Sequence, residues 1–162
     1  MFTARLIYNE CMNTLTIILL AFVALSLGIA SVYFYIFARS KERFIQFWGL
    51  CWACYSCSLL LLIFGGSVGH EVFLAIRKVF DMYNLLFLLF GVYSFQNLRI
   101  PGYWWRFSLY LLIWVFLAVL YHFDLMSLYV PTSTYQICAT AVICYLIIRF
   151  WQVPPLEKMT SV

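Results

Sequence analysis

The sequence predicts an all-α integral membrane protein, a bundle of about five transmembrane helices that forms a single domain over residues 1–151. Hydrophobic residues make up 66% of the 162 residues and charged residues only 10%, and the mean hydropathy is +0.97. Soluble domains contain roughly 45–50% apolar and about 25% charged residues, so this composition indicates that lipid surrounds most of the chain. The apolar runs are continuous and do not alternate with polar residues, which excludes a transmembrane β-barrel.

The first two predicted spans form a hairpin. The first covers residues 14–38, and its length exceeds the ~20 residues that cross the hydrocarbon core. It is also too long for the core of a signal peptide, so we expect it to remain uncleaved. A basic turn at residues 39–43 separates it from the second span, residues 44–64, which ends at three glycines within residues 65–69.

The third predicted span, residues 72–95, differs from the others. It carries Arg77, Lys78 and Asp81 in its first third, and Asn84 follows one turn later. Its purely apolar part is therefore shorter. If this helix lies only at the membrane interface, four spans remain and both termini fall on the same side.

Two further spans complete the predicted bundle. The fourth covers residues 103–121, and it begins with aromatic residues beside a basic one, a pattern typical of the membrane interface. The fifth covers residues 125–151 and contains Pro131 near its start. The helix therefore either begins after this proline or is kinked at it.

The distribution of basic residues predicts the orientation, because they gather in short connections on the cytoplasmic side. With five spans, one side carries seven basic residues: Arg39, Lys41, Arg43, Arg99, Arg106, Arg149 and Lys158. The other side carries Arg5, Arg77 and Lys78. We therefore expect the N-terminus outside, and the C-terminus with a short tail of residues 152–162 in the cytoplasm.

The charged cluster of the third span is the candidate ligand site. Arg77 and Lys78 precede Asp81 by four and three residues, and Asn84 follows it by three, which brings all of them near one helical face. Ionisable groups are costly inside a membrane, so such a cluster indicates a function, and a ligand carboxylate or phosphate could pair with Arg77. The alternative is an ion pair at the outer interface, with Arg77 and Lys78 extending toward the headgroups.

Small residues predict where helices approach one another closely. Ala24 with Gly28 on the first span, and Gly49 with Ala53 on the second, each form a pair of small residues four apart. Such pairs are typical of tight helix contacts in membranes. We expect these four residues to pack against neighbouring helices.

No metal site or cofactor is predicted. Cys51, Cys54 and Cys57 repeat every third residue, as in iron–sulfur proteins, but this spacing drifts around a continuous helix, and packing is the better explanation. His70 and His122 fall in predicted outer breaks and could approach each other, yet two isolated loop histidines are more often solvated.

Neither catalysis nor nucleic-acid binding is expected. The sequence contains no nucleophile elbow, Walker loop, HExxH motif or pair of catalytic carboxylates. The basic residues are spread over the connections and form no patch for a nucleic acid. Among the abundant aromatic residues, Trp52 and Tyr55 could line a pocket, although core packing is the more usual role.

Several motifs between residues 33 and 106 resemble one known group of membrane regions. After Tyr35, the second span and the turn before it read Arg39-Ser40-Lys41-Glu42-Arg43-Phe44 and then Phe47-Trp48-Gly49-Leu50-x-Trp52-x-x-Tyr55. The third span and the loop after it add Asn84-Leu85-Leu86, Gly91-x-Tyr93-x-Phe95, Arg99-x-Pro101 and Trp104-Trp105. This part of the chain resembles the N-terminal multi-helix membrane sensor regions of bacterial sensor histidine kinases and diguanylate cyclases.

The resemblance implies a non-catalytic sensory module of the bacterial plasma membrane. Such a module passes helix movement to a cytoplasmic output, and its partners would be the bilayer, a second copy in a homodimer, or a signalling protein. These regions usually have seven or eight helices and continue into an output domain, so we expect a truncated or stand-alone relative.

Two other function classes remain open. A small-solute transporter or channel subunit would show a continuous polar stripe across the membrane. A structural or assembly subunit of a larger complex would leave the small-residue faces near Gly28 and Gly49 to be buried by another chain.

Overall fold

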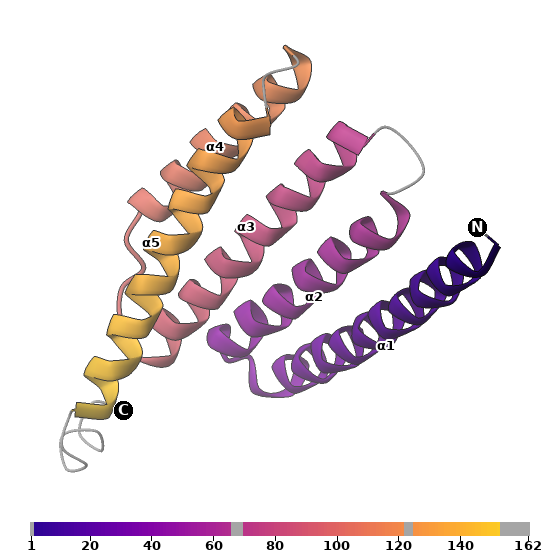
Figure 1. Ribbon diagram of the computed structural model, residues 1–162. Coiled ribbons are helices and arrows are strands. Elements are labelled where there is room, and N and C mark those ends of the chain that lie inside the picture. Colours follow the sequence, from indigo (N-terminus) through magenta and orange to yellow (C-terminus); the bar gives the residue numbers. More distant parts are fainter. Residues whose placement is uncertain (1, 66–69, 122–124, 153–162) are drawn as a thin grey trace.

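The protein is built from five α-helices, seen in a computed structural model that describes residues 2–65, 70–121 and 125–152 (Figure 1). Side chains are described for residues 14–65, 72–121 and 129–151. The helices are α1 (Phe2–Ser40), α2 (Arg43–Phe64), α3 (His70–Phe95), α4 (Tyr103–Leu120) and α5 (Leu125–Gln152).

The helix ends agree with the predicted spans except at the start of α1. The ends of α2 to α5 lie within two residues of the predicted boundaries. Helix α1 begins at Phe2, well before residue 14, because hydropathy marks the lipid-soluble part of a helix and polar residues can extend the same helix beyond it. Pro131 lies inside α5, so a helix that begins only after this proline was a wrong alternative.

Threonine side chains add hydrogen bonds next to Pro131, which cannot donate one from its own backbone. Thr132 donates to the carbonyl oxygen of Tyr129 at 3.1 Å. Thr134 donates to the carbonyl oxygen of Val130 at 2.8 Å. Such bonds to backbone oxygens are a usual accompaniment of proline within membrane helices.

Four helical segments are long and apolar enough to cross a membrane: Thr14–Ser40, Arg43–Phe64, Tyr103–Leu120 and Tyr129–Trp151. They show that the protein is an all-helical, multi-pass membrane protein. Helix α3 is not one of these four, and it is the helix that carries Arg77, Lys78 and Asp81.

The helices form an open array rather than a closed bundle (Figure 1). Within the described part of the chain, α1 packs on α2 alone, and α2 packs on α1 and α3. Helix α3 occupies the centre, because α4 and α5 also pack against it. The first helix is therefore held from one side only.

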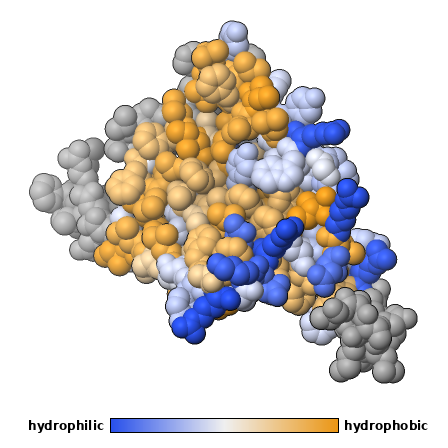
Figure 2. Space-filling model, turned by 180° about the vertical axis from the view of Figure 1, so that it is seen from behind, coloured by the Kyte–Doolittle hydropathy of each residue, from blue (hydrophilic) through white to orange (hydrophobic). Residues whose placement is uncertain are grey.

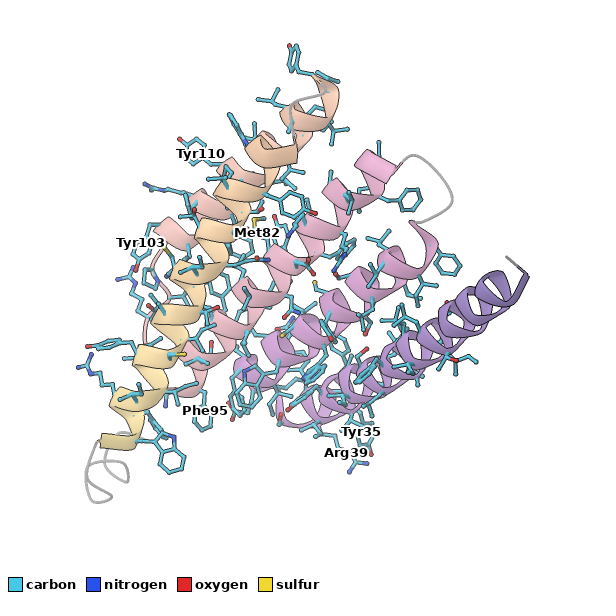
Figure 3. The ribbon with its side chains drawn as sticks, viewed as in Figure 1. Tyr35, Arg39, Met82, Phe95, Tyr103 and Tyr110 are labelled. Carbon is cyan, nitrogen blue, oxygen red and sulfur yellow. The ribbon has the colours of Figure 1, made fainter. Side chains whose placement is uncertain are left out.

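The main hydrophobic core lies between α3, α4 and α5. Figure 3 shows Met82 in the interior beside α5, and Met82 is fully buried, as are Phe90 of α3 and Tyr135 of α5. From α4, Trp104 and Leu111 join this core. Burial of this apolar surface stabilises the packing of α3, α4 and α5 on one another.

An aromatic cluster joins α2, α3 and α5 near one end of the array. The ring of Phe95 lies 5.4 Å from Phe44, 5.9 Å from Trp48 and 5.6 Å from Phe150, between ring centroids. Gly91 permits this packing, because a methyl group at its Cα would overlap the indole ring of Trp48. Helices α2 and α3 thus approach closely where the sequence provides a glycine.

Two turns at the same end contain a residue in the left-handed conformation. Lys41 follows α1 with φ 59°, and its N–H donates to the carbonyl oxygen of Phe37. Asn97 follows α3 with φ 55°, and the N–H groups of Asn97 and Leu98 close the helix in a Schellman motif. Both helices therefore stop sharply.

Much of the outer surface is apolar. In Figure 2 most of the visible surface is hydrophobic, and the strongly hydrophilic residues gather toward its lower and right-hand parts. Ile17 and Leu25 of α1 are 66% and 60% exposed, and Tyr110 and Phe116 of α4 are 71% and 65% exposed. Side chains of this kind are stable at the surface only against lipid or another protein.

Candidate functional site

Polar side chains connect α2 and α3 across an otherwise apolar interface. The thiol of Cys51 donates to Oδ1 of Asn84 at 2.9 Å. One helical turn nearer the start of α3, the hydroxyl of Ser58 donates to the carboxylate of Asp81. These bonds fix the register of the antiparallel pair, because polar groups in lipid are stable only when they are partnered.

The residues of the predicted charged cluster do not all face the same side of α3. Arg77 and Asp81 lie together, with Nε of Arg77 3.9 Å from Oδ2 of Asp81, whereas Asn84 is bonded to Cys51 of α2. Lys78 instead faces α5, where its Nζ lies 4.3 Å from the ring centre of Tyr129. Neighbouring residues on a helix point about 100° apart. Lys78 therefore points to a different side of α3 from Arg77.

Arg77 is a member of the cluster with a buried donor that has no acceptor among the described residues. This donor is the N–H group of its Nε. Asp81 already accepts a bond from Ser58. The pair is about a quarter to a third exposed, with side-chain values of 33% for Arg77 and 23% for Asp81. This arrangement fits the predicted ion pair near a helix end.

Two buried serines form the polar contact between α1 and α2. The hydroxyl of Ser56 donates to Oγ of Ser26 at 2.7 Å, and Ser26 donates in turn to the carbonyl oxygen of Val23 at 3.0 Å. Both serines are almost completely buried. This pair was not predicted from the sequence, although single polar residues within long apolar runs are a signal for such contacts.

A cavity of about 400 Å³ lies where α1, α2 and α3 meet. Its lining is mostly apolar and aromatic, and it comprises Phe22, Leu25, Ser26, Ile29, Cys51, Trp52, Tyr55, Asn84 and Leu88. No charged side chain lies among these residues. Phe22, Leu25 and Tyr55 are also exposed, so the cavity opens onto the apolar surface of the protein.

The aromatic wall of the cavity comes from α2. Trp52 and Tyr55 pack edge to face, with ring centroids 6.1 Å apart. Both were predicted either to line a pocket or to pack in the core. They line the pocket, because the helix turns Ser56 and Gly49 toward its neighbours and leaves these rings at the opening.

Asn84 is the predicted ligand residue that reaches this cavity. Its Oδ1 accepts the bond from Cys51, which leaves the two N–H groups of its Nδ2 to face other partners. No hydrogen bond of Nδ2 is found among the described residues. Asn84 is thus a free donor at an apolar cavity.

The predicted packing residues behave differently on the two helices. Gly49 is buried, and a Cβ at this position would lie 3.2 Å from the ring of Phe34. Ala53 is half-buried. Ala24 and Gly28 are exposed, and a Cβ at Gly28 would have no atom within 4 Å. Within this chain α1 packs on α2 through Val23, Ser26 and Ala30 instead, which lie on the opposite face.

No metal centre is found in the part of the chain that the structure describes. The described residues contain no group of three or more His, Cys, Asp or Glu side chains that could hold a metal ion, and Cys51, Cys54 and Cys57 are free thiols. The side chains of His70 and His122 lie outside the described residues. No protein-family model matches the chain, and no curated protein and no solved structure was found to be similar to it.

Proposed function

We propose that this chain is a membrane-embedded sensory module, without catalytic activity of its own, in which a ligand changes how α1 packs against α2 and α3. The observation that carries the proposal is the cavity at the junction of these helices. Helix α1 contributes Phe22, Leu25, Ser26 and Ile29 to the lining, yet it has no other neighbour than α2 in the described structure. A ligand in this cavity therefore contacts the one described helix that has a single neighbour.

A ligand shifts a conformational equilibrium only through its different affinity for the two states. Contacts between the ligand and both α1 and α3 supply such a difference, because they exist only while the two helices enclose the cavity. The core of α3, α4 and α5 provides the fixed reference. Movement of α1 is passed to the turn before α2, where Arg39 and Lys41 lie.

We further propose five membrane spans, with the N-terminus outside and the C-terminus in the cytoplasm. Helix α3 has 26 residues, which at 1.5 Å per residue are long enough for a ~30 Å hydrocarbon core. It lies between candidate spans on both sides. The basic turns after α1 and after α3, together with Arg149 near the end of α5, would lie on the cytoplasmic side.

The proposed relationship to the sensor regions of histidine kinases and diguanylate cyclases rests on the sequence motifs. The motif residues of α2 pack directly against those of α3: Trp48 lies over Gly91, and Phe44 contacts Phe95. These residues are therefore needed for helix packing in this chain. On this proposal the membrane is the bacterial plasma membrane, and the output is a partner signalling protein.

Spin-label distances test the sensory proposal. One label pair at Val32 of α1 and Ile76 of α3 reports the moving helix, and a second pair at Ile76 and Tyr145 of α5 reports the fixed core; all three side chains are exposed. We expect the first pair to show two distance populations whose ratio differs between phosphatidylcholine and a bacterial lipid extract. The second pair should give one unchanged distance. A single, unchanged distance for both pairs would contradict the proposal.

An assembly subunit is the second candidate function, and the exposed face at Ala24 and Gly28 favours it. Small residues on a lipid-facing helix allow another helix to approach closely. This face would serve a homodimer or a partner membrane protein. The transporter or channel reading has no comparable support, because beyond Asn84 the interface of α2 and α3 continues with Trp48, Gly91 and Phe95.

A further inference from the structure

We propose that the cavity between α1, α2 and α3 binds a neutral, bilayer-dissolved aromatic ring that carries a carbonyl group, as in quinones, with Nδ2 of Asn84 donating to the carbonyl oxygen. The inference rests on the proposed function, because it names the class of ligand that the sensory module would bind. Binding itself is measured separately from helix movement.

The lining sets the polarity of the ligand. The cavity has no charged residue in its wall, and removing an ionised group from water without a counter-ion is strongly unfavourable. Arg77 and Asp81 of α3 pair with each other and lie outside the lining. A fatty-acid carboxylate or a phosphate therefore does not fit, whereas a neutral molecule does.

The size and shape of the cavity favour a ring. Its volume of about 400 Å³ falls in the usual range for small-molecule sites. Trp52 and Tyr55 offer aromatic surfaces on one side, and Leu25 and Ile29 offer aliphatic surfaces on the other. Aromatic side chains pack favourably against a planar ring.

Asn84 supplies the recognition of the carbonyl. The Cys51 thiol bonded to Oδ1 orients the amide so that Nδ2 remains free. A ligand carbonyl oxygen in the cavity would give this donor an acceptor. A hydrocarbon of the same shape would not.

Access is from the bilayer. Phe22, Leu25 and Tyr55 surround the opening and are exposed on the apolar surface. A ligand dissolved in the membrane reaches the cavity without crossing a polar layer.

Magnetic resonance of isotope-labelled asparagine and tryptophan tests the inference in the full chain in phosphatidylcholine nanodiscs. The probes are a dimethylnaphthoquinone, methylated on the quinone ring so that it cannot add to thiols, and the corresponding dimethylnaphthalene. We expect the side-chain amide of Asn84 and the indole of Trp52 to shift saturably with the quinone, while Asn97 in the α3–α4 turn stays unchanged. The hydrocarbon should bind about fivefold more weakly, which corresponds to one net hydrogen bond.

Three variants sharpen the result. In Asn84→Leu, the indole of Trp52 should report equal affinities for quinone and hydrocarbon. Gln136→Leu removes an amide from α5 outside the cavity and should keep the fivefold preference. Leu25→Trp fills the opening, leaves Asn84 intact and should block both probes, so a folding defect of the Asn84 variant would not decide the outcome.

Equal affinities of the two probes in the unchanged protein, no saturable shift at Asn84, or stronger competition by decanoate than by the quinone would each overturn the inference. Quinone binding as expected, with no change in the Val32–Ile76 distances, would uphold the ligand class and overturn the sensory role. Val32–Ile76 distances that change without quinone binding would uphold the sensory role and overturn the ligand class.

Discussion

At the scale of the residue, glycines decide how closely α2 meets its neighbours. The absence of a side chain at Gly49 leaves room for Tyr33 and Phe34 of α1. At Gly91 it leaves room for the indole of Trp48. Trp48 is also surrounded by Tyr33 at 6.0 Å and Phe44 at 5.4 Å between ring centroids. The ring is therefore packed on several sides, and a shift would disturb these contacts.

Gly91→Ala should consequently destabilise the protein. A methyl group at this position overlaps the indole ring, and overpacking of this kind costs about 1–3 kcal/mol. The measurement is the free energy of unfolding in mixed micelles. Gly102→Ala is the matched control, because a Cβ there has no atom within 4 Å and the backbone is already helical; equal losses in both variants would contradict the explanation.

Part of the candidate site could be predicted residue by residue from the sequence, and part could not. Asn84 was predicted as a ligand residue because a polar group inside a span indicates a function. A pocket at Trp52 and Tyr55 was considered, but core packing was the preferred prediction. The contacts of Ser26 with Ser56 depend on the rotation of two helices about their axes. A single sequence does not determine that rotation, since lipid-facing and protein-facing residues are both apolar.

At the scale of the element, α1 is the helix with the fewest neighbouring helices in the described structure. It packs on α2 alone, through Val23, Ser26 and Ala30. Its other faces are exposed, including the small residues Ala24 and Gly28. Helix ends were predictable because glycines, prolines and charges interrupt the apolar runs, but the partner of each helix face was not.

Gly28→Leu tests whether the outer face of α1 holds a second copy. The position is open within the chain, so the stability of the monomer should change by less than about 0.5 kcal/mol. A bulky side chain prevents close helix approach, and self-association should weaken about tenfold. Energy transfer between labelled copies, measured as lipid is added, reports this change.

Ile18→Ala is the control for this variant. Ile18 is exposed on the same helix but lies about 80° around it from Gly28, at ~100° per residue. Self-association should be unchanged in the control. An equal loss in both variants, or no loss in either, would argue against a specific interface at Gly28.

At the scale of the whole molecule, composition determined the class of protein but not its shape. The all-helical, multi-pass character follows from 66% hydrophobic residues in continuous runs. The open arrangement, with α1 outside the core of α3 to α5, does not follow. Hydropathy measures solubility in lipid, and both exposed and packed faces of a membrane helix satisfy it.

The number of spans is also a property of the whole molecule, and one experiment decides it. With five spans, the α1–α2 turn and the α3–α4 turn lie on the same side, because α2 and α3 both cross. With α3 only at the interface, the two turns lie on opposite sides. Cysteines at the exposed positions Ser40 and Leu98 distinguish these cases, in a background whose six native cysteines are replaced.

We expect a membrane-impermeant maleimide to label both positions in inside-out vesicles and neither in right-side-out vesicles. The physical reason is the basic character of both turns, which carry Arg39, Lys41, Arg43 and Arg99 and which resist translocation. Labelling of Ser40→Cys and Leu98→Cys from opposite sides would show that α3 does not cross the membrane. Arg77 and Asp81 would then lie at the interface, and the cavity beside Asn84 would open close to the headgroups rather than within the hydrocarbon.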